Sequence, residues 1–207
     1  MNICIAHDSA LIVVDVQNDF CPGGALPVPE WGKVIPVLNR YIRKFIDAGL
    51  PVYLTRDWHP GDHRSFKSQG GIWPMHCVQE TEGGRFHPEL SIPSTAVVIS
   101  KGTDPGKEAY SGFQGTDLTH QLKQRQVGRL FVGGLATDYC VKGTVLDAIR
   151  EGFEVVFLSD ASMGVDVNAG DSERAVEEML RAGAIKAVSK DIIQVNDRKS
   201  AGQIKRP

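Results

Sequence analysis

The sequence predicts an α/β fold, a single doubly wound domain of three α/β/α layers around a mostly parallel six-stranded sheet. Six short runs rich in Val and Ile lack the polar alternation of half-exposed strands, which indicates buried parallel strands. Segments with a helical period lie between these runs, and such alternation is typical of doubly wound sheets. The predicted strands are Leu11–Val16, Pro51–Thr55, Ala96–Ser100, Arg129–Gly133, Glu154–Ser159 and Ala184–Val188.

Two segments between the strands carry the clearest helical period. The first comprises Val34, Val37, Leu38, Tyr41, Ile42 and Phe45, and the second comprises Val141, Thr144, Val145, Ala148 and Ile149. Glycine is a common helix stop signal because it adopts the left-handed conformation without strain. Gly49, Gly152 and Gly183 are predicted to end helices in this way.

Length and composition indicate one domain with a substantial core. The chain has 207 residues, of which 42% are hydrophobic, and nothing in it demands a second core. We expect the folded core to span about residues 10–190. Residues 196–207 are polar and slightly basic, which predicts a flexible tail.

Charge and cysteine content indicate the class of binding partner and the cellular compartment. The formal net charge is −2 and no basic run contains interleaved aromatics, so we expect a small-molecule substrate rather than nucleic acid or an anionic membrane. Four scattered cysteines without C-x-x-C spacing favour neither a disulfide scaffold nor a zinc knuckle. No signal peptide pattern or run of ~20 apolar residues is present, so a cytoplasmic protein is predicted.

Reactive side chains follow three of the predicted strands. Asp15 lies at the end of the first strand, Lys101 follows the third and Cys140 follows the fourth. Ligands of doubly wound folds collect at the carboxyl ends of strands, so these side chains are expected to meet. A lysine ammonium and a helix N-terminus would depress the pKa of the thiol, while the carboxylate moves the proton. The alternatives are a structural Asp15–Lys101 ion pair and a Cys140 that is only a small buried apolar residue.

A long segment from Trp58 to Pro93, rich in Gly, Pro and His, offers metal ligands. Alternate residues of extended backbone point the same way, so Asp57 and His59 can converge, and His76 lies farther along. Two imidazoles and a carboxylate leave coordination positions open, as in catalytic Zn, Fe or Mn sites. Solvated loop histidines are the alternative. Cys77, adjacent to His76, is expected to point away.

The chain resembles the nicotinamidases of the isochorismatase-like cysteine hydrolase superfamily from Ala10 to about Val188. The resemblance rests on ordered blocks. These are Asp15–Phe20 with Pro22–Leu26, Thr55–Pro60, Trp73–Cys77, Lys101-Gly102, Tyr110–Phe113 and Gly134–Val141.

The resemblance implies a role for each matched residue. It implies a catalytic triad of Asp15, Lys101 and Cys140, and an oxyanion hole formed by the backbone N–H groups of Ala136 and Cys140. It also implies a divalent metal ion bound by Asp57, His59 and His76, with Zn as the first candidate and Fe or Mn as alternatives. Phe20, Trp73 and Tyr110 are implied to contact the substrate. Ordinary core packing is the alternative for these aromatics. A cis peptide before Ala136 is also implied, although Leu135 replaces the usual Val or Ile. His63 lies where some relatives place a further ligand.

The implied activity is that of an amidohydrolase that converts nicotinamide to nicotinate and ammonia through a cysteine thioester, in NAD salvage. Pyrazinamide is a second candidate substrate. The alternatives are an amidase for N-carbamoyl compounds and a ligand sensor without turnover. The implied metal ligands argue against the N-carbamoyl amidase, because such amidases and the isochorismatases lack these ligands. Homo-oligomers are common in the family, and the sequence leaves that state open.

Overall fold

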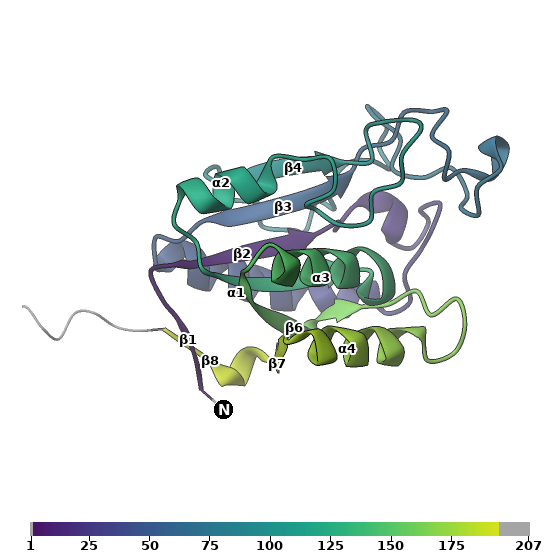
Figure 1. The fold of residues 1–207 in the computed structure, drawn as a ribbon. Coiled ribbons are helices and arrows are strands. Elements are labelled where there is room, and N and C mark those ends of the chain that lie inside the picture. Colours follow the sequence, from purple (N-terminus) through teal and green to yellow (C-terminus); the bar gives the residue numbers. More distant parts are fainter. Residues whose placement is uncertain (1, 195–207) are drawn as a thin grey trace, which may run out of the picture.

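The computed structural model describes residues 2–194 and contains the predicted sheet. Six parallel strands are arranged in the order β4-β3-β2-β5-β6-β7 (Figure 1). The strands are β2 (Ser9–Val14), β3 (Val52–Asp57), β4 (Val97–Lys101), β5 (Arg129–Leu135), β6 (Glu154–Met163) and β7 (Ile185–Ala187). The α/β class and the six strands are therefore confirmed. The tail predicted for residues 196–207 lies outside the described residues.

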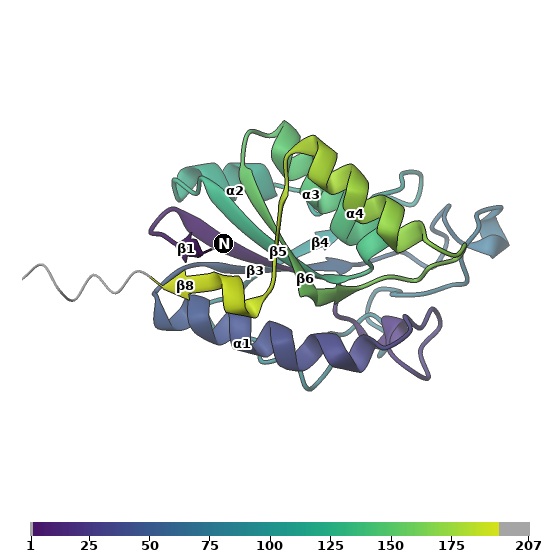
Figure 2. The ribbon, with the colours of Figure 1, turned by 90° about the horizontal axis from the view of Figure 1, so that it is seen from below.

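Helices cover both faces of the sheet and make the three predicted layers. α1 (Val34–Asp47) covers one face, and α2 (Leu118–Gln124), α3 (Lys142–Arg150) and α4 (Asp171–Ala182) cover the other (Figure 2). The glycine stop signals are confirmed, because Gly49, Gly152 and Gly183 have φ values of 71°, 91° and 111°. Short helical turns occupy Asn18–Phe20, Trp31–Lys33, Lys67–Gln69 and Ser189–Asp191.

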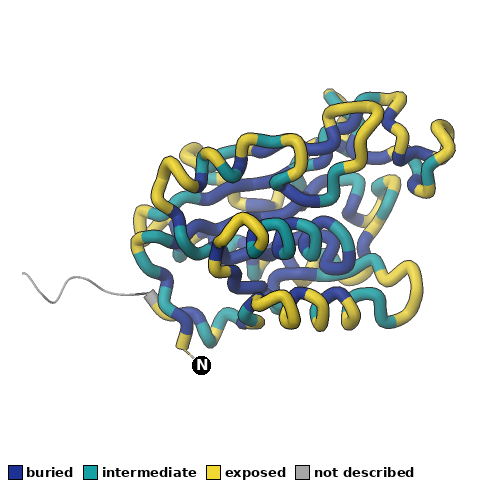
Figure 3. The backbone as a smooth tube through the Cα atoms, viewed as in Figure 1, coloured by how far each residue is buried: buried dark blue, intermediate teal, exposed yellow. Residues whose placement is uncertain are grey.

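Side chains of the central strand β2 point alternately to the two faces of the sheet, so the core has two halves. Leu11 and Val13 pack with the buried face of α1, whereas Ile12 and Val14 pack on the side of α2, α3 and α4. The central strands β2 and β5 are buried almost along their whole length, the edge strands β4 and β7 are only partly buried, and the outer helix turns are exposed (Figure 3). Both faces of a parallel sheet are covered in this way, which explains the near-continuous apolar runs in the sequence.

The structure differs from the prediction at the chain ends and at several strand boundaries. The largest difference is in β6, which continues to Met163, beyond the predicted end at Ser159. A parallel pair of β1 (Ile3–Ile5) and β8 (Ile192–Gln194) was not predicted, because three-residue strands are too short to show a period. The first predicted strand was placed too far along, since β2 ends at Val14. Asp15 has φ 49°, which turns the chain out of the extended conformation. Within residues 2–194 no helix has the length and apolarity to cross a bilayer.

The carboxyl edge of four adjacent strands gathers the residues that the sequence singles out. Lys101 ends β4, Asp57 ends β3 and Asp15 follows β2. β5 leads through Ala136 into a π-helical turn, Thr137–Val141, which precedes α3. Strand order, rather than distance along the chain, therefore brings these residues together.

Candidate active site

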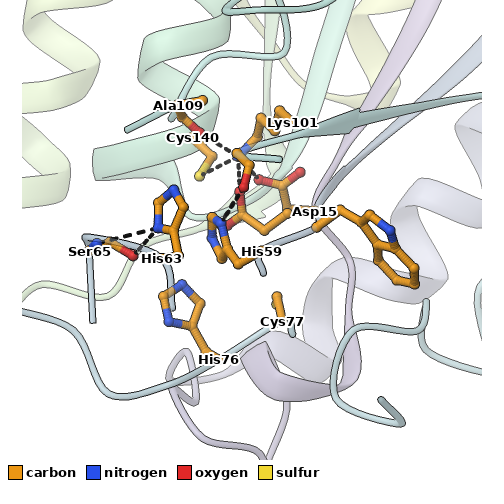
Figure 4. A network of polar contacts seen from close by, with 12 residues as sticks. Asp15, His59, His63, Ser65, His76, Cys77, Lys101, Ala109 and Cys140 are labelled. Carbon is orange, nitrogen blue, oxygen red and sulfur yellow. Dashed lines mark hydrogen bonds and ion pairs between the residues drawn. The ribbon is translucent and has the colours of Figure 1, made fainter. Parts of the chain in front are cut away.

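Lys101 is the centre of the site (Figure 4). Its Nζ lies 2.9 Å from Asp15 Oδ2 and 3.4 Å from Cys140 Sγ, donates to the Ala109 carbonyl at 3.2 Å and pairs with Asp57 Oδ1. Its side chain has no exposure to solvent. Burial alone would lower the pKa of Lys101, but the two carboxylates outweigh burial and raise the pKa well above its usual value. Lys101 is therefore a fixed positive charge between a thiol and two carboxylates.

Asp15 is a buried carboxyl group held by both its oxygens. Thr55 donates a hydrogen bond of 2.6 Å to Oδ1, while Lys101 holds Oδ2. Burial raises the pKa of Asp15 despite the opposing effect of the Lys101 ammonium. A carboxyl group with a raised pKa can both accept and release a proton nearer neutral pH, as general acid–base chemistry requires.

Cys140 lies in the turn between β5 and α3, as the sequence predicts, but its thiol is not activated in the way expected. Burial raises the pKa of Cys140 well above its usual value, and Lys101 only partly offsets this effect. The neighbouring Asp15 and Asp57 carboxylates raise the pKa further. The prediction of a depressed thiol pKa is therefore wrong, because sequence shows charged neighbours but not the depth of burial. The sulfur needs a proton acceptor as it attacks, and Asp15 is in place: ligand atoms of Asp15, Asp57 and Cys140 lie within 4.8 Å of one another.

The backbone around Ala136 shapes the turn that carries Cys140. The Leu135–Ala136 peptide bond is cis, in accordance with the resemblance. The Ala136 carbonyl accepts the N–H groups of Tyr139 at 3.1 Å and Val141 at 3.0 Å. Ala136 and Cys140, the two residues expected to form an oxyanion hole, both line the cavity described below.

Asp57, His59 and His76 form a second cluster beside Lys101. Each offers one ligand atom, and these atoms lie within 4.8 Å of one another. His59 Nδ1 donates to the Gly102 carbonyl at 2.9 Å and His76 Nδ1 donates to the Pro74 carbonyl at 2.7 Å, so each ring presents Nε2 to the cluster. All three side chains are buried. This oxygen and two-nitrogen donor set, oriented by backbone carbonyls, fits a divalent metal such as Zn, Fe or Mn.

The charge states of Asp57 and His76 suit metal binding, whereas at His59 burial is outweighed by the neighbouring Asp57, which raises the pKa of the ring. Burial alone would raise the pKa of Asp57, but Lys101 and His59 outweigh burial and hold the pKa below its usual range. Burial lowers the pKa of His76, which favours the neutral ring that a metal ligand needs. Asp57 thus serves two neighbours, because it pairs with Lys101 and faces His59 Nε2 at 3.7 Å.

His63 and Cys77 lie beside the cluster without joining it. The His63 ring stacks on the His59 ring, with the ring centroids 4.2 Å apart. However, His63 Nδ1 lies 2.7 Å from Ser65 Oγ, and His63 Nε2 lies 2.9 Å from the Lys107 carbonyl oxygen. Both ring nitrogens are therefore engaged within the chain. Cys77 is buried, and its backbone N–H donates to Asp19 at 2.7 Å.

A cavity of about 480 Å³, counted with its open mouth, lies over these groups. Its wall includes Phe20, Trp73 and Tyr110, the three aromatics expected to contact substrate, and also Tyr139. Trp73 Nε1 donates a hydrogen bond of 3.0 Å to the Tyr110 hydroxyl. An apolar aromatic cavity with a few polar groups at one end is typical of a site for a small aromatic ligand.

Three functional candidates were missed by sequence reasoning. Thr55 contacts Asp15, and Tyr139 lines the cavity beside Cys140. Gln17 is fully buried and binds the backbone of Asp57 on both sides, since its Oε1 accepts the Asp57 N–H at 2.8 Å and its Nε2 donates to the Asp57 carbonyl at 2.8 Å. A polar residue two positions from a candidate catalytic or metal residue was an available signal for Gln17 and Thr55.

The fold and this site define an α/β enzyme with a buried cysteine, lysine and carboxylate at the carboxyl edge of a parallel sheet. The family model for the isochorismatase domain matches residues 9–189. The chain therefore belongs to the isochorismatase family.

Relatives of known name and structure are similar over most of the chain. The nicotinamidase of Escherichia coli K12 is 43% identical over 196 residues, which cover 84% of this chain and 92% of that protein. The crystal structure of a Pyrococcus horikoshii pyrazinamidase in complex with zinc has a TM-score of 0.84 at 53% identity and covers 87% and 99% of the two chains. The structure of PnC1 from L. infantum in complex with nicotinate has a TM-score of 0.85 at 30% identity, with coverages of 94% and 100%.

Proposed function

We propose that this protein hydrolyses nicotinamide to nicotinate and ammonia through a thioester on Cys140. The observation that carries the proposal is the contact of one buried ammonium, Lys101, with both Asp15 and Cys140 at the end of an aromatic cavity. The names of the relatives, nicotinamidase and pyrazinamidase, support this choice of substrate. Pyrazinamide, a similar ring with the same carboxamide, is the second substrate that we propose.

In the first half of the reaction, the Cys140 sulfur attacks the carboxamide carbon while its proton passes to Asp15. Lys101 stabilises the negative charge that develops on sulfur and holds Asp15 in place. The carbonyl oxygen becomes an oxyanion, and the backbone N–H groups of Ala136 and Cys140 are the donors that we assign to it. One such donor is worth about 3 kcal/mol. Asp15 then gives its proton to the nitrogen as the C–N bond breaks and ammonia leaves.

In the second half, water hydrolyses the thioester. Asp15, again a carboxylate, accepts a proton from the water as its oxygen attacks the thioester carbon. The same backbone donors stabilise the second tetrahedral intermediate. The C–S bond breaks, the proton on Asp15 returns to the Cys140 sulfur, and the carboxylic acid is released and loses its proton to solvent, which gives nicotinate. The raised pKa of Asp15 suits this alternation between base and acid.

Asp57, His59 and His76 are the residues that we assign to a divalent metal, with Zn as the first candidate and Fe or Mn as alternatives. A metal held there supplies a Lewis-acid position for the ring nitrogen of the substrate. Zinc is favoured because the P. horikoshii relative was solved in complex with zinc. We assign Phe20, Trp73 and Tyr110 to the aromatic ring of the substrate.

A cytoplasmic location and a role in NAD salvage belong to the same proposal. Cys4, Cys21, Cys77 and Cys140 are all free thiols in the structure, the state that a reducing compartment maintains.

The test is ammonia release by the purified protein from nicotinamide, pyrazinamide and an N-carbamoyl amide such as N-carbamoylsarcosine. We expect turnover of the first two and little of the third. Binding of nicotinamide without ammonia release would indicate a ligand sensor, and preference for the N-carbamoyl amide would indicate the other class of amidase. Either result would overturn the proposal.

A further inference from the structure

We propose that Tyr139 determines which ring-substituted aromatic amides this protein accepts, by closing the side of the cavity next to Cys140. The inference rests on the proposed function and deepens it, since it defines the substrate class as six-membered aromatic carboxamides without substituents on the edge that faces Tyr139. No role was expected for this residue from the sequence.

Tyr139 belongs to a wall of three aromatic side chains. Its ring packs edge-on against Trp73, with centroids 4.9 Å apart and an interplanar angle of 82°, and lies 5.6 Å from the ring of Tyr110. Trp73 and Tyr110 are joined by the indole hydrogen bond of 3.0 Å. All three line the cavity. Because each ring supports the other two, the wall has one arrangement, and an added ring substituent cannot be accommodated by moving a single side chain.

The backbone of Tyr139 is fixed independently of its side chain. The Tyr139 N–H donates to the Ala136 carbonyl at 3.1 Å. The preceding residue, Asp138, is buried and accepts the N–H groups of Val165 at 3.0 Å and Asp166 at 2.8 Å. Together with the bond of 3.0 Å from the Val141 N–H to the same Ala136 carbonyl, these bonds hold the turn on both sides of Tyr139. They do not involve the Tyr139 ring, which is only half-buried. Shortening the side chain should therefore enlarge the cavity while Cys140 stays in position.

Selectivity between a substituted and an unsubstituted ring is the quantity that isolates this role. A loss of folding or of general activity lowers kcat/KM for every amide alike, whereas an opened wall changes the ratio between amides. A methyl group that a pocket rejects or admits typically changes kcat/KM by 10–200-fold. The effect should reside mainly in KM, because the reacting groups do not move.

The experiment compares the metal-loaded wild type with Tyr139→Ala, Tyr139→Leu and Tyr139→Phe. The substrates are nicotinamide, its 2-, 4-, 5- and 6-methyl derivatives and quinoline-3-carboxamide. The control is Ile72→Ala, which removes a 67% exposed side chain next to Trp73 in the chain. We expect Tyr139→Ala and Tyr139→Leu to raise kcat/KM for at least one substituted amide, relative to nicotinamide, by about tenfold. Tyr139→Phe and Ile72→Ala should keep the wild-type ratios.

Unchanged ratios for every amide in both shortened variants would overturn the proposal. So would a change in Tyr139→Phe as large as that in Tyr139→Ala, because the ring would then not be the determinant. Failure of the proposed function is separate, since it would appear in the wild type as an absence of nicotinamide hydrolysis.

Discussion

Thr55 donates a hydrogen bond of 2.6 Å to Asp15 across the pairing of β3 with β2, and neither side chain is exposed to solvent. Lys101 occupies the other carboxylate oxygen. The proposed general acid and base is therefore oriented from two sides, by a neutral donor and by a charged one. Thr55 acts through Asp15, which makes it a positioning residue.

Replacement of this donor gives the first prediction. Thr55→Val keeps the shape of the side chain but removes its hydroxyl, and a buried hydrogen bond to a charged group is worth about 1.5–3 kcal/mol, so kcat should fall roughly 10–100-fold. The Thr55 bond lowers the pKa of Asp15. Its removal should raise the pKa of Asp15. Because the base must be ionised, the acid limb of the pH–activity profile should then move to higher pH. Steady-state kinetics against pH tests this. Thr55→Ser should restore the wild-type profile, and an unchanged profile in Thr55→Val would contradict the assignment.

Removal of the proposed nucleophile gives the second prediction. Cys140→Ala should abolish ammonia release while folding, followed by circular dichroism, and metal content remain unchanged, because the substitution removes only the reacting sulfur. Acid trapping of the wild type during turnover should yield a mass adduct on Cys140. Cys4→Ala, a change at a half-buried cysteine elsewhere in the chain, should leave turnover intact. An adduct on Cys21 or Cys77 would show that the wrong thiol was chosen.

The third prediction concerns the reactivity of the thiol. Lys101 lowers the pKa of Cys140 against the larger effect of burial, so Lys101→Ala should move alkylation of Cys140 to higher pH. The same change leaves Asp15 and Asp57 without their shared ammonium, and breaking a buried ion pair typically destabilises a protein by about 3–5 kcal/mol. Iodoacetamide labelling against pH and urea unfolding measure the two effects. Superimposable labelling curves would remove the role assigned to the lysine.

Metal removal gives the fourth prediction. If the ion on Asp57, His59 and His76 binds the ring nitrogen, chelation should reduce hydrolysis of nicotinamide far more than that of benzamide, which has the amide but no ring nitrogen. His59→Ala should reproduce this contrast and lower the metal content found by elemental analysis. His87→Ala and His120→Ala, outside the cluster, should do neither. Equal losses on both amides would point to a structural ion.

The sequence was sufficient for the strands and for the residues at their carboxyl ends, because buried parallel strands leave an apolar run that stops where a polar side chain follows. It was insufficient for contacts that depend on strand order. Thr55 meets Asp15 only because β3 lies next to β2, and no local pattern specifies that neighbour. The raised pKa of Cys140 depends on how deeply its thiol is buried, which the neighbouring residues in the sequence do not show. The pairing of β1 with β8 escaped prediction because each strand has only three residues, too few to show a period.

The pairing of β2 with β5 has a consequence for how the protein folds. It sets Ser9 beside Arg129, so the chain must close a loop of about 120 residues before Asp15 and Cys140 can meet. Closing so long a loop costs chain entropy before the strand contacts form and offset this cost, so sheets with such long-range pairing form slowly. A ribosome-bound chain that has not yet released β5 therefore lacks the partner strand of β2, and it also lacks Cys140 and the proposed oxyanion donors that follow β5. During refolding, helical signal should return first, and ammonia release should return only with the closure of the central sheet.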